Sequence, residues 1–225
     1  MTPQPPRSEG ELVARAEALA GHTLGELAAQ LWVAVPDEPR RAKGWAGTLL
    51  ERALGATAAS RAAPDFPGLG IELKSVSVDA RGQPTESTYV CTAPLDAVAL
   101  GPWRDAWVRH KLQRVLWIPI TAGGPLGART VGAPIPWSPS DDDDALLRRD
   151  YTEIAEIVAA GELWQLDARR GEALQVRPKG QDGSDAAWAL DEDGGWVRDT
   201  PRGFYLRRRF TAGLLARDRV PPGRG

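Results

Sequence analysis

PDFPGLGIELKS, residues 64–75, places two acids and a lysine at fixed spacing across a turn and the extended run that follows it. Asp65 precedes the Gly- and Pro-containing turn, while Glu72 and Lys74 lie on the extended run. Side chains alternate between the two faces of a strand, so Glu72 and Lys74 point to one face and the apolar residues beside them to the other. The stretch therefore predicts a strand with a charged face, and a turn that brings Asp65 beside Glu72.

Two carboxylates that converge on one point repel each other unless a cation joins them. Mg²⁺ suits such a place because it prefers oxygen ligands and is held by one or two carboxylates together with water and phosphate. A lysine beside the ion could position the attacking water, which is the pattern of metal-assisted phosphodiester hydrolysis. The spacing alone leaves open a second interpretation, in which Glu72 and Lys74 face solvent on an edge strand and Asp65 only forms a turn.

Helices are predicted before this stretch. Ser8 with Glu11, and Thr23 with Glu26, have the spacing of helix-capping boxes. A third helix is expected over residues 44–55, where apolar residues recur at helical spacing. Residues 1–7 are expected to form a flexible tail, followed by a single domain over 8–225. That domain could form two lobes around a cleft, the first comprising the helical residues 8–60 with part of the sheet and the second residues 61–225.

Strands and helices alternate after residue 70, which predicts an α+β or mixed α/β fold. The runs 70–78 and 87–95 are expected to pair as a hairpin across a turn rich in Asp, Gly and Pro. Further strands are expected in the sequences RVLWIPI, EALQVRPK and GFYLRR, a long helix after Ser140, and a last helix in FTAGLLARD. The Gly- and Asp-rich residues 180–196 are expected to form an exposed insertion.

Composition excludes several classes of protein. The chain has 225 residues, of which 42% are hydrophobic and 26% charged, as in soluble globular proteins. No apolar run or leader pattern predicts a membrane helix or a secretory signal, so a cytoplasmic protein is expected. One cysteine and two histidines leave no internal disulfide and no histidine-rich metal site. The formal net charge of -2 does not suggest a general nucleic-acid binder, although the arginine-rich C-terminal end could form a cationic face.

Several longer blocks resemble the MutH-type DNA mismatch-repair endonucleases. They are KGWAGTLLERALGA, DFPGLGIELKSVSVDARGQPTESTYVCTAPL, VRHKLQRVLWIPI, VGAPIPWSPS, LQVRPK and TPRGFYLRRRFTAGLLAR. The resemblance implies the restriction-endonuclease fold, with a central mixed sheet flanked by helices, so that residues 8–225 would be a single nuclease domain whose cleft takes DNA. It implies a Mg²⁺-dependent nick, with one or two ions, in the unmethylated strand of a hemimethylated GATC site. It also implies stimulation by MutL after MutS has found a mismatch.

The resemblance also implies roles for individual residues. Asp65 and Glu72 match the metal ligands, and Lys74 matches the catalytic lysine of the family site. Glu51, on the third helix, matches a further acidic residue, and Lys111, in VRHKL, matches a second active-site lysine. On their own, Glu51 would be taken for a solvated helix residue and Lys111 for a surface base.

Other positions match DNA-contacting parts of the family. Tyr205 matches a tyrosine near the adenine whose N6 amino group, in the major groove, carries or lacks the methyl group. The remaining DNA-contacting positions that the resemblance implies are Lys43, Gly44, Arg177, Pro178 and Lys179.

Two alternatives remain open on the sequence. A type II restriction endonuclease of the same fold would cut both strands, usually as a symmetric dimer, whereas a strand-specific nick suits a monomer. A non-catalytic DNA-binding module that recruits a partner is the alternative from a different class. The presence of Asp65, Glu72 and Lys74 together argues against it.

Overall fold

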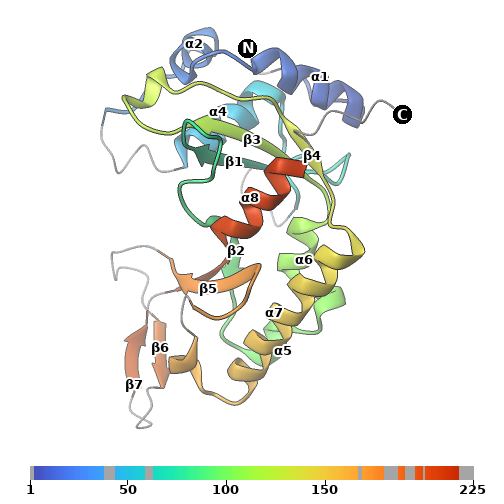
Figure 1. Cartoon of the computed structure of the whole chain (residues 1–225), viewed down its shortest axis with the longest axis vertical. Helices are drawn as coiled ribbons and strands as arrows, with labels where there is room; N and C mark the ends of the chain where they lie inside the picture. Colours follow the sequence, from blue (N-terminus) through green and yellow to red (C-terminus); the bar gives the residue numbers. More distant parts are fainter. Residues whose placement is uncertain are drawn as a thin grey trace. The chain divides into compact units, whose positions relative to one another are not determined.

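The computed structural model describes residues 3–37, 44–58, 63–166, 169–179, 187–190, 196–199 and 201–217, and the fold is mixed α+β as predicted (Figure 1). The chain divides into two compact units. The first unit comprises Met1–Thr85, Arg114–Ser138 and Leu215–Gly225, and the second comprises Glu86–Gln113 and Pro139–Leu214. Among the helices of the described ranges, none is long and apolar enough to cross a membrane.

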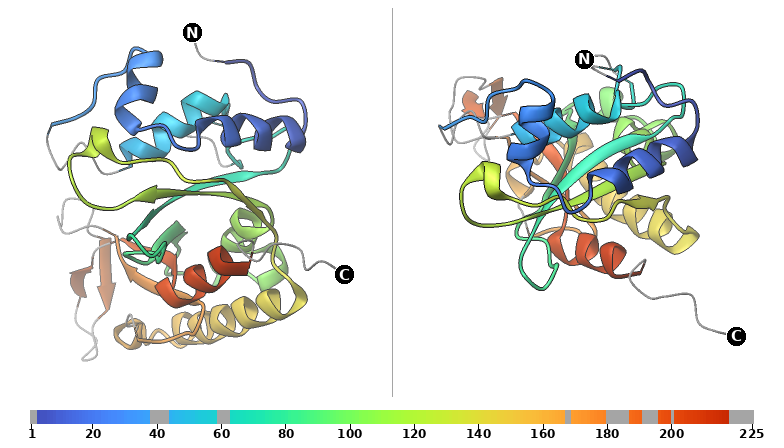
Figure 2. Two further views of the ribbon diagram at one scale, coloured as in Figure 1. Left: turned by 45° about the horizontal axis from the view of Figure 1, so that its top comes forward. Right: turned by 90° about the horizontal axis from the view of Figure 1, so that it is seen from above.

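The first unit is built on a mixed sheet. Strand β3 (Val115–Thr121) lies in the middle, parallel to β1 (Glu72–Val78) and antiparallel to β4 (Ile135–Trp137). The other elements of this unit are α1 (Glu9–Leu19), α2 (Leu24–Gln30), α4 (Trp45–Leu54) and the 3-10 turn η2 (Leu126–Ala128). The three helices gather on one side of β1 and β3 (Figure 2). This arrangement confirms the predicted mixed sheet with flanking helices.

The central strand of the first unit, β3, lies in the hydrophobic core of that unit. All residues of β3 except its last are buried, as expected for a strand covered on both faces. Leu50 of α4 and Leu12 of α1 pack in one cluster with Leu73 of β1 and Ile118 of β3. Because Leu73 enters this core, Glu72 and Lys74 are directed to the other face of β1, as the alternation of the sequence predicts.

The second unit contains an antiparallel sheet in the order β2 (Thr88–Ala93), β8 (Arg202–Leu206), β5 (Leu174–Pro178). A separate pair is formed by β6 (Ala187–Leu190) and β7 (Trp196–Asp199), of which β6 and the first residue of β7 lie in the region where the sequence predicts an insertion. The rest of that region lies outside the described residues. The helices are α5 (Ala97–Leu100), η1 (Trp103–Asp105), α6 (Trp107–Leu112), α7 (Asp141–Ala159) and η3 (Leu163–Gln165), and α8 (Arg208–Arg217) spans a unit boundary.

The predicted helix starts are confirmed. Thr23 and Ser140 each cap a helix through a full capping box, and Ser8 accepts a hydrogen bond from the backbone of Glu11. At α1 the reciprocal bond differs, because the Glu11 carboxylate accepts from the backbone of Arg7 rather than from that of Ser8. Within the N-terminal stretch expected to be a tail, the Gln4 carbonyl accepts a hydrogen bond from Arg15, 2.6 Å away.

The predicted hairpin between residues 70–78 and 87–95 is wrong. The chain does turn back after β1, since Val78 bridges Pro84 and the Thr85 backbone donates to Ser77, 2.9 Å away. Proline has no backbone N–H to donate, so the pairing is short, and the chain enters the second unit after Thr85. Strand β1 takes β3 as its parallel partner instead, and β2 pairs with β8.

Candidate active site and aromatic sheet face

A tight turn of the first unit joins Asp65 to Glu72. Phe66 and Ile71 form an antiparallel bridge, with the Phe66 backbone donating to the Ile71 carbonyl at 2.9 Å. Asp65 and Glu72 are the residues directly outside this bridge. An Asp65 carboxylate oxygen also accepts the backbone N–H of Leu73 at 2.8 Å. This local geometry explains the spacing of the two acids in the sequence.

Glu72 and Lys74 form an ion pair in a protected place. Lys74 Nζ donates to Glu72 Oε1 at 2.8 Å. Glu72 is 3% exposed, which contradicts the interpretation of this residue as solvent-facing. Trp117, next to Lys74 in the register of β1 and β3, is fully buried. A buried carboxylate needs a partner to offset its lost hydration, and the lysine ammonium supplies one.

We call residues 65–74, the tight turn with the start of β1, the hairpin. Arg114 connects this hairpin to the rest of the first unit. Its backbone carbonyl accepts the N–H of Glu72 at 2.9 Å, and its guanidinium donates to the carbonyl of Leu69 in the turn at 2.7 Å. The same guanidinium pairs with Glu9 of α1. One residue thus holds both the turn and the first residue of β1.

Glu51 lies on a helix that packs against the same strand. A Cβ atom at Gly47, one turn before Glu51, would lie 3.6 Å from Ser75 Oγ of β1. Beyond the helix, the N–H groups of residues 57–58 donate to the carbonyl of Asp65. Glu51 is half-buried, and its carbonyl accepts the N–H that ends α4. Its role as a further acid of the site stays a prediction.

The chemistry of Asp65 and Glu72 fits Mg²⁺. In the part of the chain that the structure describes, no three or more His, Cys, Asp or Glu side chains gather in a group that could hold a metal. Mg²⁺ does not need such a group, because it commonly retains waters and binds one or two carboxylates and a substrate phosphate. Two carboxylates with a lysine beside them meet that requirement.

Lys111 belongs to the second unit. It lies on α6, with its Nζ 5.4 Å from the ring centroid of Trp107. Such a distance allows a cation–π contact, which directs the ammonium along the helix surface. Its assignment as a second active-site lysine stays a prediction.

The sheet of the second unit carries two tyrosines flanked by cations. Tyr89 of β2 and Tyr205 of β8 are register partners, with ring centroids 5.3 Å apart in an edge-to-face arrangement. The Arg177 guanidinium lies 5.6 Å from the Tyr205 ring, and Lys179 Nζ lies 5.3 Å from the Tyr89 ring. Each aromatic ring thus has one cation over it, and we call these four residues the aromatic sheet face.

Gly203 leaves room for both rings. A Cβ atom there would lie 2.8 Å from Tyr89 Cε2 and 3.1 Å from Tyr205 Cε2, closer than side chains pack. Burial, followed by the neighbouring Tyr89, raises the pKa of the Tyr205 phenol, and the nearby cations Arg177 and Lys179 oppose that change. The phenol therefore stays protonated at neutral pH and can donate a hydrogen bond.

The structure brings together several of the residues predicted to contact DNA. Arg177, Pro178 and Lys179 are consecutive and exposed at the end of β5, next to Tyr205 on β8. Gly44 is the left-handed residue before α4, with φ of 77°, and Lys43 lies outside the described residues. The sequence interpretation missed two members of this region, Tyr89 and Gly203. The signal for Tyr89 was a strand aromatic, but its neighbour could be known only from the pairing of β2 with β8.

These two arrangements define a class of protein. A buried carboxylate–lysine pair beside a second carboxylate, on a mixed sheet covered by helices, suits phosphodiester hydrolysis. Two aromatic rings in contact, each with a cation over it, suit contact with nucleic acid. The fold and the site together are those of a nuclease.

Comparison with known proteins specifies the family. Residues 54–150 match the family model described as DNA mismatch repair enzyme MutH. The chain is similar to the DNA mismatch repair protein MutH of Klebsiella pneumoniae (strain 342), with 47% identity over 95% of this chain and 93% of the relative. It is 46% identical to that of Serratia proteamaculans over 96% of this chain and 95% of the relative. For the Escherichia coli K12 (DH10B) protein the identity is 45%, over 95% of this chain and 94% of the relative.

The chain therefore belongs to the MutH family of DNA mismatch-repair endonucleases. The resemblance noted in the sequence is confirmed, and with it the restriction-endonuclease-like fold and the assignment as a nuclease.

Proposed function

We propose that this chain is a Mg²⁺-dependent endonuclease that nicks the unmethylated strand of DNA at hemimethylated GATC sites. The observation that carries the proposal is the hairpin of the first unit, in which the Asp65 carboxylate accepts the N–H of Leu73, next to Glu72, and Lys74 pairs with Glu72. Its activator would be MutL, with MutS acting indirectly after it finds a mismatch. It would act as a monomer, because a nick needs only one active site. Its place would be the cytoplasm.

Asp65 and Glu72 would hold the ion through their carboxylate oxygens, with Glu51 as a further acid of the site. Bound Mg²⁺ would supply Lewis-acid stabilisation of the charge that develops on the phosphate. Lys74 would orient the attacking water and offset phosphate charge, and the burial of its pair with Glu72 strengthens both electrostatic effects. Lys111 is proposed to contribute a second positive charge.

The aromatic sheet face supports a role in reading the site. A methyl group on adenine N6 adds no charge, so it must be sensed in the major groove by crowding or by a lost hydrogen bond. Tyr205 offers a rigid ring and a protonated phenol for this purpose. Arg177, Pro178 and Lys179, beside it, would contact bases and phosphates. Lys43 and Gly44 are proposed to contact DNA from the loop before α4.

The deciding experiment is cleavage of unmethylated, hemimethylated and fully methylated GATC duplexes with Mg²⁺, with and without MutL. A duplex with the same four bases scrambled serves as the control, and a supercoiled plasmid reports the type of cut. We expect open circles, cleavage of the unmethylated strand only, and faster cleavage with MutL. Linear plasmid without an open-circle stage would indicate a double-strand restriction enzyme. DNA binding with no cleavage under any of these conditions would indicate a recruitment module.

A further inference from the structure

A buried carboxylate on α7 binds the chain just before the DNA-reading residues of β5. Asp150 is 2% exposed, and one of its oxygens accepts three successive backbone N–H groups. The donors are Glu172 at 2.8 Å, Ala173 at 2.6 Å and Leu174 at 2.9 Å. Hydrogen bonds to a carboxylate are stronger than those between neutral groups, so this contact restrains the first residue of β5 and the two before it.

The turn before these residues fits closely around the carboxylate. Gly171 has φ of 76°, and a Cβ atom there would lie 1.9 Å from the Leu174 carbonyl oxygen and 3.3 Å from Asp150 Cγ. No side chain other than hydrogen could occupy this position without moving the turn. The backbone and the carboxylate are therefore fitted to each other.

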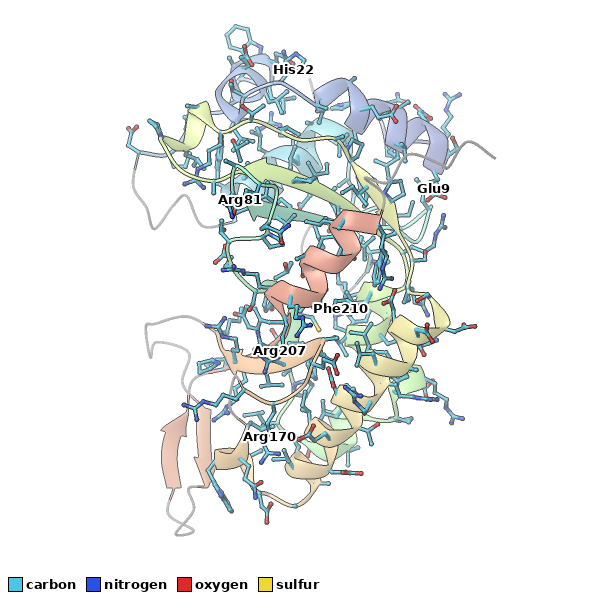
Figure 3. All side chains as sticks on the ribbon, viewed as in Figure 1. Glu9, His22, Arg81, Arg170, Arg207 and Phe210 are labelled. Atoms are coloured by element: carbon cyan, nitrogen blue, oxygen red, sulfur yellow. The ribbon has the colours of Figure 1, made fainter. Side chains whose placement is uncertain are left out.

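The same segment is tied to the strand beside it. The backbone N–H of Arg207, directly after β8, donates to the carbonyl of Ala173 at 2.8 Å. The Arg207 guanidinium donates to the carbonyl of Arg170 at 2.9 Å, and Figure 3 labels both arginines. The start of β5 is thus held by α7 on one side and by the end of β8 on the other.

The position at which β5 begins fixes its register with β8, and this register places the residues of the aromatic sheet face. In that register Gln175 lies opposite Tyr205, and Arg177 lies opposite Gly203. A slip of one residue would turn every side chain of the strand to the other face. Arg177 would then leave the Tyr205 ring, although both residues would remain in the sheet.

The exposed ion pair in this region is not a sufficient restraint. Arg149 pairs with Glu172 at 2.8 Å, but the two side chains are 63% and 69% exposed. Surface pairs of this kind contribute little to stability because water and salt screen them. The buried carboxylate of Asp150, rather than this ion pair, is therefore the side-chain contact from α7 that restrains the start of β5.

We propose that Asp150 is a positioning residue for DNA recognition, which sets the register of β5 and so places Arg177 over Tyr205. Asp150 contacts no base and takes no part in bond cleavage. This inference rests on the proposed function in one respect, which is that the aromatic sheet face recognises the GATC sequence.

The test compares Asp150→Ala, Asp150→Asn and a control, Ile157→Ala, which removes a buried side chain of α7. Two quantities are measured on each folded variant: hydrogen–deuterium exchange in residues 172–179, and the ratio of Kd for scrambled DNA to Kd for GATC DNA. We expect Asp150→Ala to speed exchange there at least tenfold and to lower the Kd ratio about tenfold, the size of one good base contact. Asp150→Asn keeps an acceptor oxygen and should stay within about threefold of wild type. If Asp150→Ala does not fold, Asp150→Ser, which keeps a shorter acceptor, replaces it.

Ile157→Ala separates positioning from general destabilisation. It should lower Tm while leaving the Kd ratio near that of wild type. If Asp150→Ala changes exchange and the Kd ratio no more than Ile157→Ala does, the positioning role is overturned. If wild type itself does not prefer GATC, the proposed function fails, and exchange in residues 172–179 still decides whether Asp150 restrains β5.

Discussion

The hairpin around Asp65 and the aromatic sheet face are built in different ways. The hairpin takes its acids and its lysine from one short stretch, residues 65–74, joined by a tight turn. The aromatic sheet face takes one tyrosine from β2, one from β8 and its cations from the end of β5. A group that is local in sequence is positioned by backbone geometry alone, whereas a group from three strands depends on register. We therefore expect the two regions to fail differently when they are altered.

The largest effect is expected at the hairpin. Glu72→Ala removes a proposed metal ligand and the partner of Lys74, so the cleavage rate should fall by roughly 10³-fold, the loss of several kcal/mol of transition-state stabilisation. DNA affinity should change by less than about threefold, because the carboxylate adds little to phosphate binding before the reaction. Single-turnover cleavage and fluorescence anisotropy measure the two quantities.

Glu17→Ala, at an exposed acid of α1, is the control and should match wild type in both measurements. A cleavage rate near that of wild type for Glu72→Ala at saturating Mg²⁺ would remove Glu72 from the metal site. A large loss of affinity together with activity would mean that the hairpin is not independent of DNA binding.

A change in the aromatic sheet face is expected to reduce the preference for GATC DNA rather than the rate of cleavage. Gly203→Ala brings a methyl group to 2.8 Å from one ring, so Tyr89 and Tyr205 must separate. We expect the preference for GATC over scrambled DNA to fall by roughly tenfold to a hundredfold, within the range for one base contact. Competition binding at fixed salt measures the preference. Gly213→Ala, where a Cβ atom would have nothing within 4 Å, is the matched control.

The sequence predicted the hairpin better than the sheet for a physical reason. The positions of Asp65, Glu72 and Lys74 follow from one turn and the alternation of one strand, both of which are local. The pairing of β1 with β3 is parallel and crosses a long connection, so the local turn after β1 suggested the wrong partner.

The sequence nevertheless indicated most members of the aromatic sheet face, because the resemblance supplied Tyr205, Arg177 and Lys179. Tyr89 could not be found in this way, since its place beside Tyr205 depends on a pairing between distant strands. Gly203 could not be found either, because the need for glycine arises only when both rings are in place. The sequence did not show how β2 and β8 pair, and this register mattered more than the strand propensity of either segment.

Arg114 offers a finer test of how the hairpin is held. Arg114→Ala keeps the backbone carbonyl that binds Glu72 but removes the hydrogen bond to Leu69 and the pair with Glu9. The turn should loosen, and we expect the cleavage rate to fall about fivefold, since a small misplacement of reacting groups is costly. The ratio of rates on unmethylated and methylated strands should not change.

Glu9→Ala removes only the contact to α1 and should cost less than Arg114→Ala. The side chains of this pair are about half exposed, so the pair itself contributes little. Equal losses for the two variants would show that the turn is held through α1. A change in methyl discrimination in either variant would contradict the separation of the two regions.

The smallest effect is expected for Tyr89→Phe, and it distinguishes the ring of this residue from its hydroxyl. The hydroxyl shares a hydrogen bond with Thr92 Oγ1 at 3.2 Å, in an exposed place where water can replace either partner. The ring, in contrast, contacts Tyr205 and lies beneath Lys179. If the face reads DNA through its rings and cations, Tyr89→Phe should lower the GATC preference by less than about threefold, whereas Tyr89→Ala should lower it by roughly tenfold. Competition binding on the two variants measures the difference. Equal losses of GATC preference in the two variants would mean that the Tyr89 hydroxyl, with its hydrogen bond to Thr92, recognises the DNA. No loss in either variant would mean that Tyr205 recognises the DNA without the Tyr89 ring.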